Sequence, residues 1–138
     1  MITFHTLTRA TRGFCDCHDL TGDLKQCIAS SGTSDGLLTV TVPGSTASIT
    51  TIEFEPGAIE DLRQAVERLI PRDIHYHHDA RWGDGNGFAH VGAALLGPSL
   101  SIPIKQAHMV LGTWQQVILV DFDNRPRRRE IIAQIISG

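Results

Sequence analysis

The sequence predicts an α+β domain with a mixed or antiparallel sheet and two or three helices. Segments that alternate apolar and polar side chains arrive in runs of two to four, and single amphipathic segments separate these runs. A strict alternation of strand and helix would instead indicate a parallel βαβ fold. No repeat, linker or low-complexity segment divides the chain, so we expect one compact domain over residues 1–138.

Period-two patterns predict strands in the N-terminal half. Residues 2–8 alternate apolar and polar side chains, and residues 13–17 are expected to form the hairpin partner of that strand. Segments 38–42 and 45–53 are rich in Thr, Val and Ile, which favour strands.

Two helices are predicted before residue 72. A short helix begins at Asp19 or Thr21 and ends at Gly32. A longer helix begins at Pro56 and ends before Pro71, with apolar side chains on one face at spacings of three and four. This amphipathic pattern is typical of a helix that lies on a sheet.

A third helix is predicted from about residue 87 to 96, after a polar loop at 72–85, with Asn86 at its N-cap. Nearly every side chain in it is small or apolar, so we expect a buried helix. Its expected apolar stripe consists of Phe88, Val91 and Leu95.

Four more strands are predicted towards the C-terminus, at 100–104, 108–111, 115–122 and 129–136. The last two are apolar on both faces, which is typical of central strands that are covered on both sides.

Composition excludes several classes of protein. The net charge of −3 argues against a general nucleic-acid binder, and no apolar run approaches the ~20 residues that cross a bilayer. The N-terminus has no signal-peptide pattern, so we expect a cytoplasmic protein. Its three cysteines then fit reduced thiols with structural roles.

Residues 75–90 gather the groups best suited to chemistry. Three of the seven histidines lie in the loop at 75–79, and His90 stands twelve residues beyond His78. Alternating glycines at 83–87 let a backbone approach a ligand closely, and they lead into a helix N-terminus, which favours an anion.

Three side chains in this region are candidates to converge on one point: His78, Asp84 and His90. Their nitrogen and oxygen donors suit Zn²⁺ or Ni²⁺. A buried His90 needs partners for both ring nitrogens, so it is a metal ligand, a catalytic base or part of a closed network. The glycine run is also typical of an ordinary tight loop, and loop histidines are usually solvated, so these alternatives stay open.

Two other segments carry polar side chains that are candidates to line the edge of a binding site. Four arginines at 125–129 are able to clamp a phosphate, or else they pair with Asp121 and Asp123 in a hairpin turn. Ser45 and Thr46 place hydroxyl groups at a strand junction.

Several motifs together resemble, in order and spacing, the YjbQ-like family of small proteins. They are Trp82-Gly83-Asp84-Gly85-Asn86-Gly87, Ala89-His90, Leu95-Leu96-Gly97-Pro98-Ser99 and Leu111-Gly112-Thr113-Trp114-Gln115-Gln116. The segments 45–50 and 122–129 are similar as well, so the resemblance covers essentially the whole chain.

The resemblance implies a trimer-forming α+β fold. It also implies activity as a secondary thiamine-phosphate synthase, which joins hydroxymethylpyrimidine diphosphate to thiazole phosphate and releases pyrophosphate. Many members of the family carry a histidine where this sequence has Gly44.

From these observations we expect a cytoplasmic homotrimer that binds a small phosphorylated molecule and neither nucleic acid nor membrane. The expected catalytic residues are His78, Asp84, Asn86 and His90. The expected substrate-binding residues are Ser45, Thr46, Gly85 and Arg127. His78 and His90 are the expected ligands of a divalent Zn, Ni or Mg ion. The alternative is a non-catalytic trimer that binds a metal ion or an anion.

Overall fold

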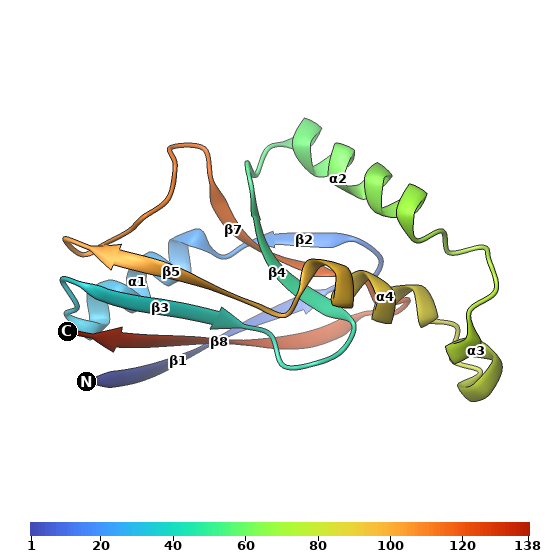
Figure 1. The fold of residues 1–138 in the computed structure, drawn as a ribbon, viewed down its shortest axis with the longest axis horizontal. Coiled ribbons are helices and arrows are strands. Elements are labelled where there is room, and N and C mark those ends of the chain that lie inside the picture. The colour runs from blue at the N-terminus through green and yellow to red at the C-terminus, as the bar shows by residue number, and fades with distance from the viewer.

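Two antiparallel sheets form the framework of the computed structural model, which describes residues 1–138 (Figure 1). The larger sheet has the order β1 (Ile2–Thr11), β8 (Arg127–Ser137), β3 (Gly36–Thr41), β5 (Ser99–Lys105) and β6 (His108–Met109). The smaller sheet has the order β2 (Asp16–Asp19), β7 (Gln116–Asp121) and β4 (Ala47–Ile52). Every strand pair is antiparallel.

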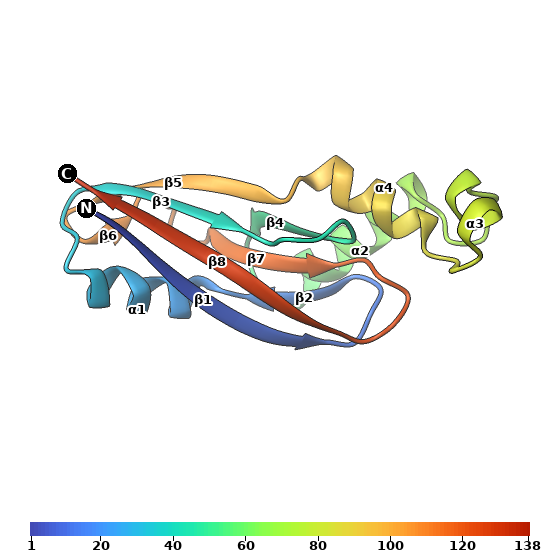
Figure 2. The same cartoon turned by 90° about the horizontal axis from the view of Figure 1, so that it is seen from below.

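Four helices accompany the sheets: α1 (Thr21–Ser31), α2 (Pro56–Leu69), α3 (His77–Trp82) and α4 (Gly87–Leu96). The helices α2 and α4 pack against the smaller sheet, α1 lies near β1, and α3 sits at the far end of the molecule (Figure 2). The α+β prediction is therefore confirmed. None of these helices combines the length and the apolar character that a bilayer crossing requires.

The number of helices differs from the two or three expected, because α3 lies inside the segment predicted as a polar loop. Its six residues are too few for apolar side chains to recur at helical spacing, so the sequence pattern did not predict this helix. It begins with the amide groups of Asp79 and Ala80 donating to the carbonyl of Tyr76, and it ends at Gly83 in the left-handed conformation.

The strand β7 is the centre of the fold because it is buried on both faces. Val117 and Leu119 lie in a core between the two sheets and α1. Ile118 and Val120 lie in a second core against α2 and α4. This arrangement confirms the expected central strand at 115–122.

The expected hairpin between the first two strands is wrong. β1 pairs with β8, whereas β2 pairs with β7 in the other sheet. Gly13 and Cys15 both have positive φ, at 122° and 54°, and the amide of Asp16 donates to the carbonyl of Gly13. This tight turn carries the chain from one sheet to the other instead of folding it back.

The buried face of α4 also differs from the expected stripe. Phe88 is buried, but Val91 is 38% exposed and Leu95 is 63% exposed. The buried face consists instead of Phe88, Ala89, Gly92 and Ala93. Small side chains lie inward because α4 approaches β4 closely, and the hydroxyl of Ser48 donates to the carbonyl of Ala93 at 3.0 Å.

One face of the larger sheet has no cover, and no helix lies in front of β1, β8 and β3 in Figure 2. Strand register aligns Ile2, Ile136, Leu37 and Pro103 in one row across four strands of this face. The first three are 55%, 42% and 38% exposed. β8 is therefore buried on one face only, unlike the doubly covered strand expected at 129–136.

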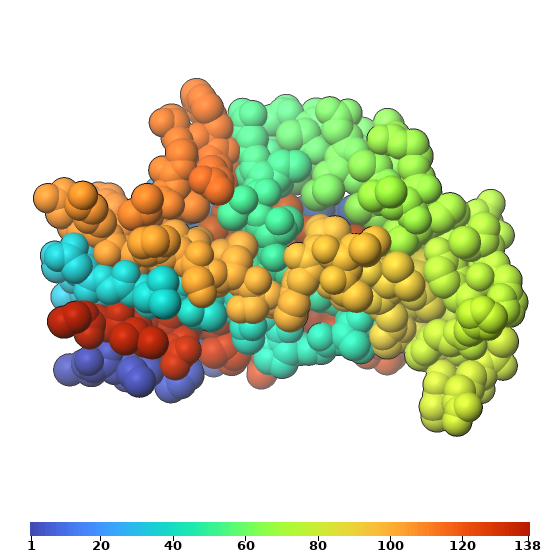
Figure 3. Space-filling model, viewed as in Figure 1, coloured from blue at the N-terminus to red at the C-terminus, as the bar shows by residue number.

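The segment after β6, drawn in orange in Figure 3, projects from the body of the protein. It carries the Gly-Thr-Trp-Gln-Gln run at 112–116, in which Trp114 is 69% exposed. The side chain of Gln115 donates to Thr51, and that of Gln116 accepts from the amide of Phe54, so this segment is anchored beside β4.

Because α4 lies close to the core, we expect alanine substitutions at two glycines to have different effects on stability. A Cβ at Gly92 would lie 2.8 Å from Ile70 and 3.0 Å from Phe122, so Gly92→Ala should destabilise the protein by about 1–3 kcal/mol. A Cβ at Gly22 in α1 meets nothing within 4 Å, and Gly22→Ala should be neutral or stabilising. Denaturant unfolding of both variants measures the difference. Equal stability of the two would contradict the packing of α4.

Candidate functional site

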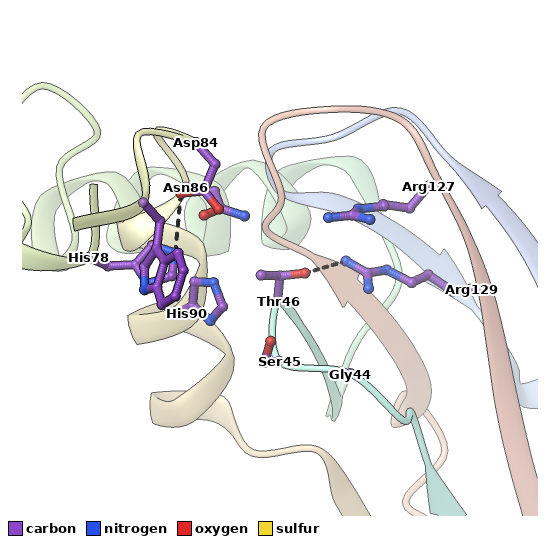
Figure 4. A pocket seen from close by; sticks show the side chains of 10 residues that line it. Gly44, Ser45, Thr46, His78, Asp84, Asn86, His90, Arg127 and Arg129 are labelled. Atoms are coloured by element: carbon purple, nitrogen blue, oxygen red, sulfur yellow. Dashed lines mark hydrogen bonds and ion pairs between the residues drawn. The ribbon is translucent and has the colours of Figure 1, made fainter. Parts of the chain in front are cut away.

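A cavity of about 500 Å³ opens at the end of the molecule where the β3–β4 turn, the α3–α4 region and β8 meet (Figure 4). Arg127 and Arg129 form one wall, and His78, Asp84 and His90 face them from the other. The full lining is Gly44, Ser45, Thr46, His78, Trp82, Asp84, Asn86, His90, Arg127 and Arg129.

The arginine wall follows from strand geometry, because residues two apart in β8 point to the same face. Arg129 donates from Nε to Asp121 Oδ2 at 2.7 Å and from Nη2 to Asp121 Oδ1 at 3.0 Å. Arg127 donates from Nε to Asp123 Oδ2 at 2.8 Å. Neither Nη1 group donates a hydrogen bond within the chain, so each guanidinium is oriented by its aspartate and keeps free N–H groups.

Gly44 lets this wall approach the turn. It has φ of 137°, and a Cβ there would lie 3.3 Å from Arg129 Nη1. Thr46 connects the two ion pairs, because its hydroxyl accepts from Arg129 at 2.7 Å and donates to Asp123 at 3.0 Å.

Asp121 and Asp123 are both fully buried, and each is surrounded by donors. Asp121 also accepts from the hydroxyl of Thr11 at 2.7 Å and from the amide of Asp123. Burial by itself would raise the pKa of Asp123. Hydrogen bonds from the Asn124 amide and from the side chains around the carboxylate outweigh burial and hold that pKa below its ordinary value.

The histidine wall brings together α3, the α3–α4 turn and α4. His78 and His90 have ring centroids 4.3 Å apart, and His78 Nε2 lies 3.2 Å from Asp84 Oδ1. This last contact is not an aligned hydrogen bond, since the buried Nε2 atom has no hydrogen-bond partner. Two imidazoles next to a carboxylate form a set that is able to accept or donate a proton.

Asn86 supplies an unsatisfied acceptor to the same cavity. Its side chain is 6% exposed and donates through Nδ2 to Asp123 at 3.2 Å, but its Oδ1 has no partner. Buried polar atoms nearly always have a partner, so this oxygen is able to accept a hydrogen bond from an N–H or O–H group that enters the cavity, whether of a bound molecule or of water.

The cavity contains all but one of the predicted site residues. His78, Asp84, Asn86, His90, Ser45, Thr46 and Arg127 line it, and Gly85 does not. Arg129 and Trp82 also line it and were not among the expected site residues. Arg129 was considered only as one of the four arginines at 125–129, although its spacing from Arg127 along one strand places both on the same face.

The expected anion cradle at the start of α4 is wrong in its details. The amide of Gly87 already donates to the carboxylate of Asp79 at 2.7 Å. Asn86 occupies the N-cap position, but its side chain makes no cap hydrogen bond because it points to Asp123.

The geometry does not fit a three-ligand metal centre, because no three His, Cys, Asp or Glu side chains are arranged to hold an ion. Gly44 contributes no side-chain ligand. His75 and His77 are exposed, contact each other edge to face with ring centroids 5.1 Å apart, and do not line the cavity. Metal binding by His78 and His90 stays a prediction.

The lowered pKa of Asp123 predicts a specific acid dependence of stability. A depressed pKa in the folded state contributes stability that is present above the ordinary value of 3.8 and is lost as pH falls through the folded pKa. At pH 7, Asp123→Asn should therefore lower the free energy of unfolding by about 1.5–3 kcal/mol. This deficit should shrink as pH falls below the ordinary value of 3.8. Urea unfolding at several pH values measures it, with the exposed Glu130→Gln as control at pH 7. Equal stability of Asp123→Asn and wild type at pH 7 would contradict the network.

Comparison with known proteins identifies the family. Residues 5–138 match the family model described as UPF0047 protein YjbQ-like. A UPF0047 protein of Mycobacterium bovis is 36% identical over 132 residues, covering 96% of this chain and 90% of the relative. A UPF0047 protein of Archaeoglobus fulgidus is 35% identical over 130 residues, covering 94% of this chain and 98% of the relative.

Comparison with solved structures supports the same family assignment. A YbjQ-like protein of unknown function from Sulfolobus solfataricus superposes with a TM-score of 0.95 at 28% identity, covering 100% of this chain and 99% of the other. A protein of the YjbQ/UPF0047 family from Clostridium acetobutylicum has a TM-score of 0.88 at 32% identity, covering 96% and 99%. The expected resemblance is confirmed, and the chain belongs to the YjbQ-like (UPF0047) family.

Proposed function

We propose that the cavity binds a small phosphorylated molecule and that the chain is a transferase of the secondary thiamine-phosphate synthase type. The observation that carries this proposal is the placement of two oriented guanidinium groups opposite two histidines and a carboxylate. One wall suits the phosphate of a substrate, and the other suits proton transfer or hydrogen bonding at the reacting atoms.

The phosphate end of the ligand is assigned to Arg127 and Arg129. Each guanidinium keeps Nη1 free, and its plane is held by a buried aspartate, so little side-chain freedom is lost on binding. The aspartates neutralise the two formal charges. An anion is therefore attracted by the direction of the N–H groups more than by net charge. The exposed hydroxyl of Ser45, which lines the same cavity, extends the donor set.

The other end of the ligand is assigned to Asn86, His78 and His90. The free Oδ1 of Asn86 is able to accept a hydrogen bond from an amino or hydroxyl group of the ligand. In the proposed reaction the bond from the pyrimidine methylene carbon to the diphosphate oxygen breaks, and the thiazole nitrogen forms a bond to the same carbon. Pyrophosphate leaves with the electron pair, and the arginines stabilise the charge that develops on it.

The second candidate is a binding protein without turnover. The incomplete histidine set favours it, because a centre built on His78 and His90 alone has no third protein ligand. Saturable release of pyrophosphate supports the transferase. Ligand-dependent stabilisation without turnover supports the binding protein.

Substitution of the arginine wall tests the phosphate site. Arg127→Gln should weaken the binding of inorganic pyrophosphate roughly tenfold or more, because a hydrogen bond from a charged group is removed. Arg125 lies in the same turn, is exposed and does not line the cavity, so Arg125→Gln is the matched control. Calorimetric titration gives both constants. Similar constants for the two variants would show that pyrophosphate binds elsewhere or through bulk charge.

Substitution of the histidine wall tests the chemistry. His90→Gln and Asp84→Ala should each reduce the rate of pyrophosphate release by about 10²–10⁴. His75→Ala should change little, because His75 is exposed outside the cavity. Rates are compared well below the melting temperature of each variant. A His90→Gln variant that melts earlier but turns over at the wild-type rate would make His90 a structural residue.

We also propose that the chain assembles as a homotrimer through the open face of the larger sheet. The apolar row of Ile2, Ile136 and Leu37 continues to Phe4, which is 67% exposed on the same face of β1. Contiguous exposed apolar surface of this kind marks a protein interface.

For a homotrimer, light scattering should give a mass three times the 15.1 kDa of one chain. Phe4→Glu should dissociate the assembly, because it would place a charge inside an apolar interface. Thr8→Glu is the control, since Thr8 is exposed on the same strand and face but lies beside Glu130. A wild-type mass of one chain would refute the trimer.

A further inference from the structure

A smaller cavity, of about 230 Å³, adjoins the candidate site and contains no arginine in its lining. Gly44, Ser45 and His90, which Figure 4 labels, line both cavities, so the two spaces are continuous at these residues. The remaining lining of the smaller cavity comes from the start of β4, the end of α4 and the turn that follows α4: Ala47, Ala93, Ala94 and Pro98.

This part of the cavity offers an apolar surface. Its four unshared side chains, three alanines and a proline, have no polar atom. The carbonyl of Ala93 already accepts from the Ser48 hydroxyl at 3.0 Å and from the Gly97 amide at 2.8 Å. The carbonyl of Pro98 accepts from the Val42 amide at 3.0 Å and from the hydroxyl of the preceding threonine at 3.4 Å. A hydroxylated group bound there would lose hydrogen bonds to water without replacing them, whereas a hydrocarbon or aromatic group would not.

The size of the cavity suits one ring. Ala47 and Ala93 are 1% and 6% exposed, whereas Ala94 and Pro98 are exposed, so the space reaches from the surface to the edge of the core. An apolar cavity of about 150 Å³ is known to hold one benzene molecule, so this volume admits a single aromatic ring.

The walls of the smaller cavity are held in place before any ligand binds. The bond from Ser48 to Ala93 fixes the end of α4 to β4, and the amide of Ile49 donates to the carbonyl of Gly97 at 3.2 Å. The hydrogen bond from Val42 fixes the next residue, Pro98, to the end of β3. Little ordering of the chain is therefore needed when a ring enters.

We infer that the smaller cavity binds an aromatic ring of the phosphorylated ligand, and that the site selects ring-methyl phosphate esters over sugar phosphates. This inference rests on the proposed phosphate site at Arg127 and Arg129. With the phosphate at the arginines and the ring against Ala93 and Ala94, His90 lies at the junction of the two cavities. The bond between the ring methylene and the phosphate oxygen then lies beside His90.

Three phosphate esters test the selectivity of the wild-type chain: benzyl phosphate, ribose 5-phosphate and methyl phosphate. The first two carry a ring on a methylene group, but only the first ring is apolar. Benzyl phosphate should bind roughly tenfold or more tighter than either of the others in calorimetric titration, because its ring is removed from water. Equal constants for the three esters overturn the inference and leave the phosphate site standing. Binding of none of them overturns both.

Filling the smaller cavity tests the position of the ring. In Ala94→Leu, the ratio of the benzyl to the methyl phosphate association constant should fall towards one. Ala94 is exposed and leucine is a good helix former, so this variant should fold. Ala29→Leu is the matched control, because Ala29 is exposed on α1 and lines neither cavity, and it should keep the wild-type ratio.

Arg127→Gln separates the inference from the proposed function on which it rests. This variant should weaken both esters in the same proportion and so keep the wild-type ratio, because it alters only the phosphate end of the site. A ratio that survives Ala94→Leu shows that the ring binds elsewhere and overturns the inference alone. Benzyl phosphate binding that is insensitive to Arg127→Gln overturns the phosphate site and the inference together.

Discussion

Burial of β7 on both faces is the constraint around which the protein is organised. Its alternate side chains enter two separate cores, one between the sheets and one against α2 and α4. A strand in this position must be apolar throughout, and its backbone must pair on both edges, which β2 and β4 provide. The two sheets and the outer helices are arranged so that these requirements are met at once.

The end of β7 shows how this constraint leads to a site. Asp121 and Asp123 follow the buried strand and are themselves fully buried. A buried carboxylate is strongly destabilising unless it is paired and hydrogen-bonded. Arg127 and Arg129 of the next strand satisfy them, and in doing so they become rigid donors at the rim of a cavity. The interactions that stabilise the end of the fold thus also preorganise one wall of the candidate site.

The turn at residues 12–15 packs against the elements that carry the candidate site. A Cβ at Gly13 would lie 3.3 Å from the carbonyl of Asp123, and Phe14 packs edge-on against Phe88 of α4 at 5.6 Å. The turn therefore contacts the elements that line the candidate site. The candidate site thus depends on the path by which the chain leaves β1 and enters the smaller sheet.

Local patterns in the sequence determined most of the elements and the identity of the candidate site. Alternation located the strands, the spacing of three and four located α2, and the histidines and glycines at 75–90 pointed to the region that lines the cavity. These signals are local, because they depend on which side chains share a face of one strand or helix. Tertiary structure alone decided the pairing of β1 with β8, the buried face of α4, and the partners of Asp121 and Asp123. Each of these depends on contacts between residues far apart in the chain, and such contacts leave no periodic trace in either segment.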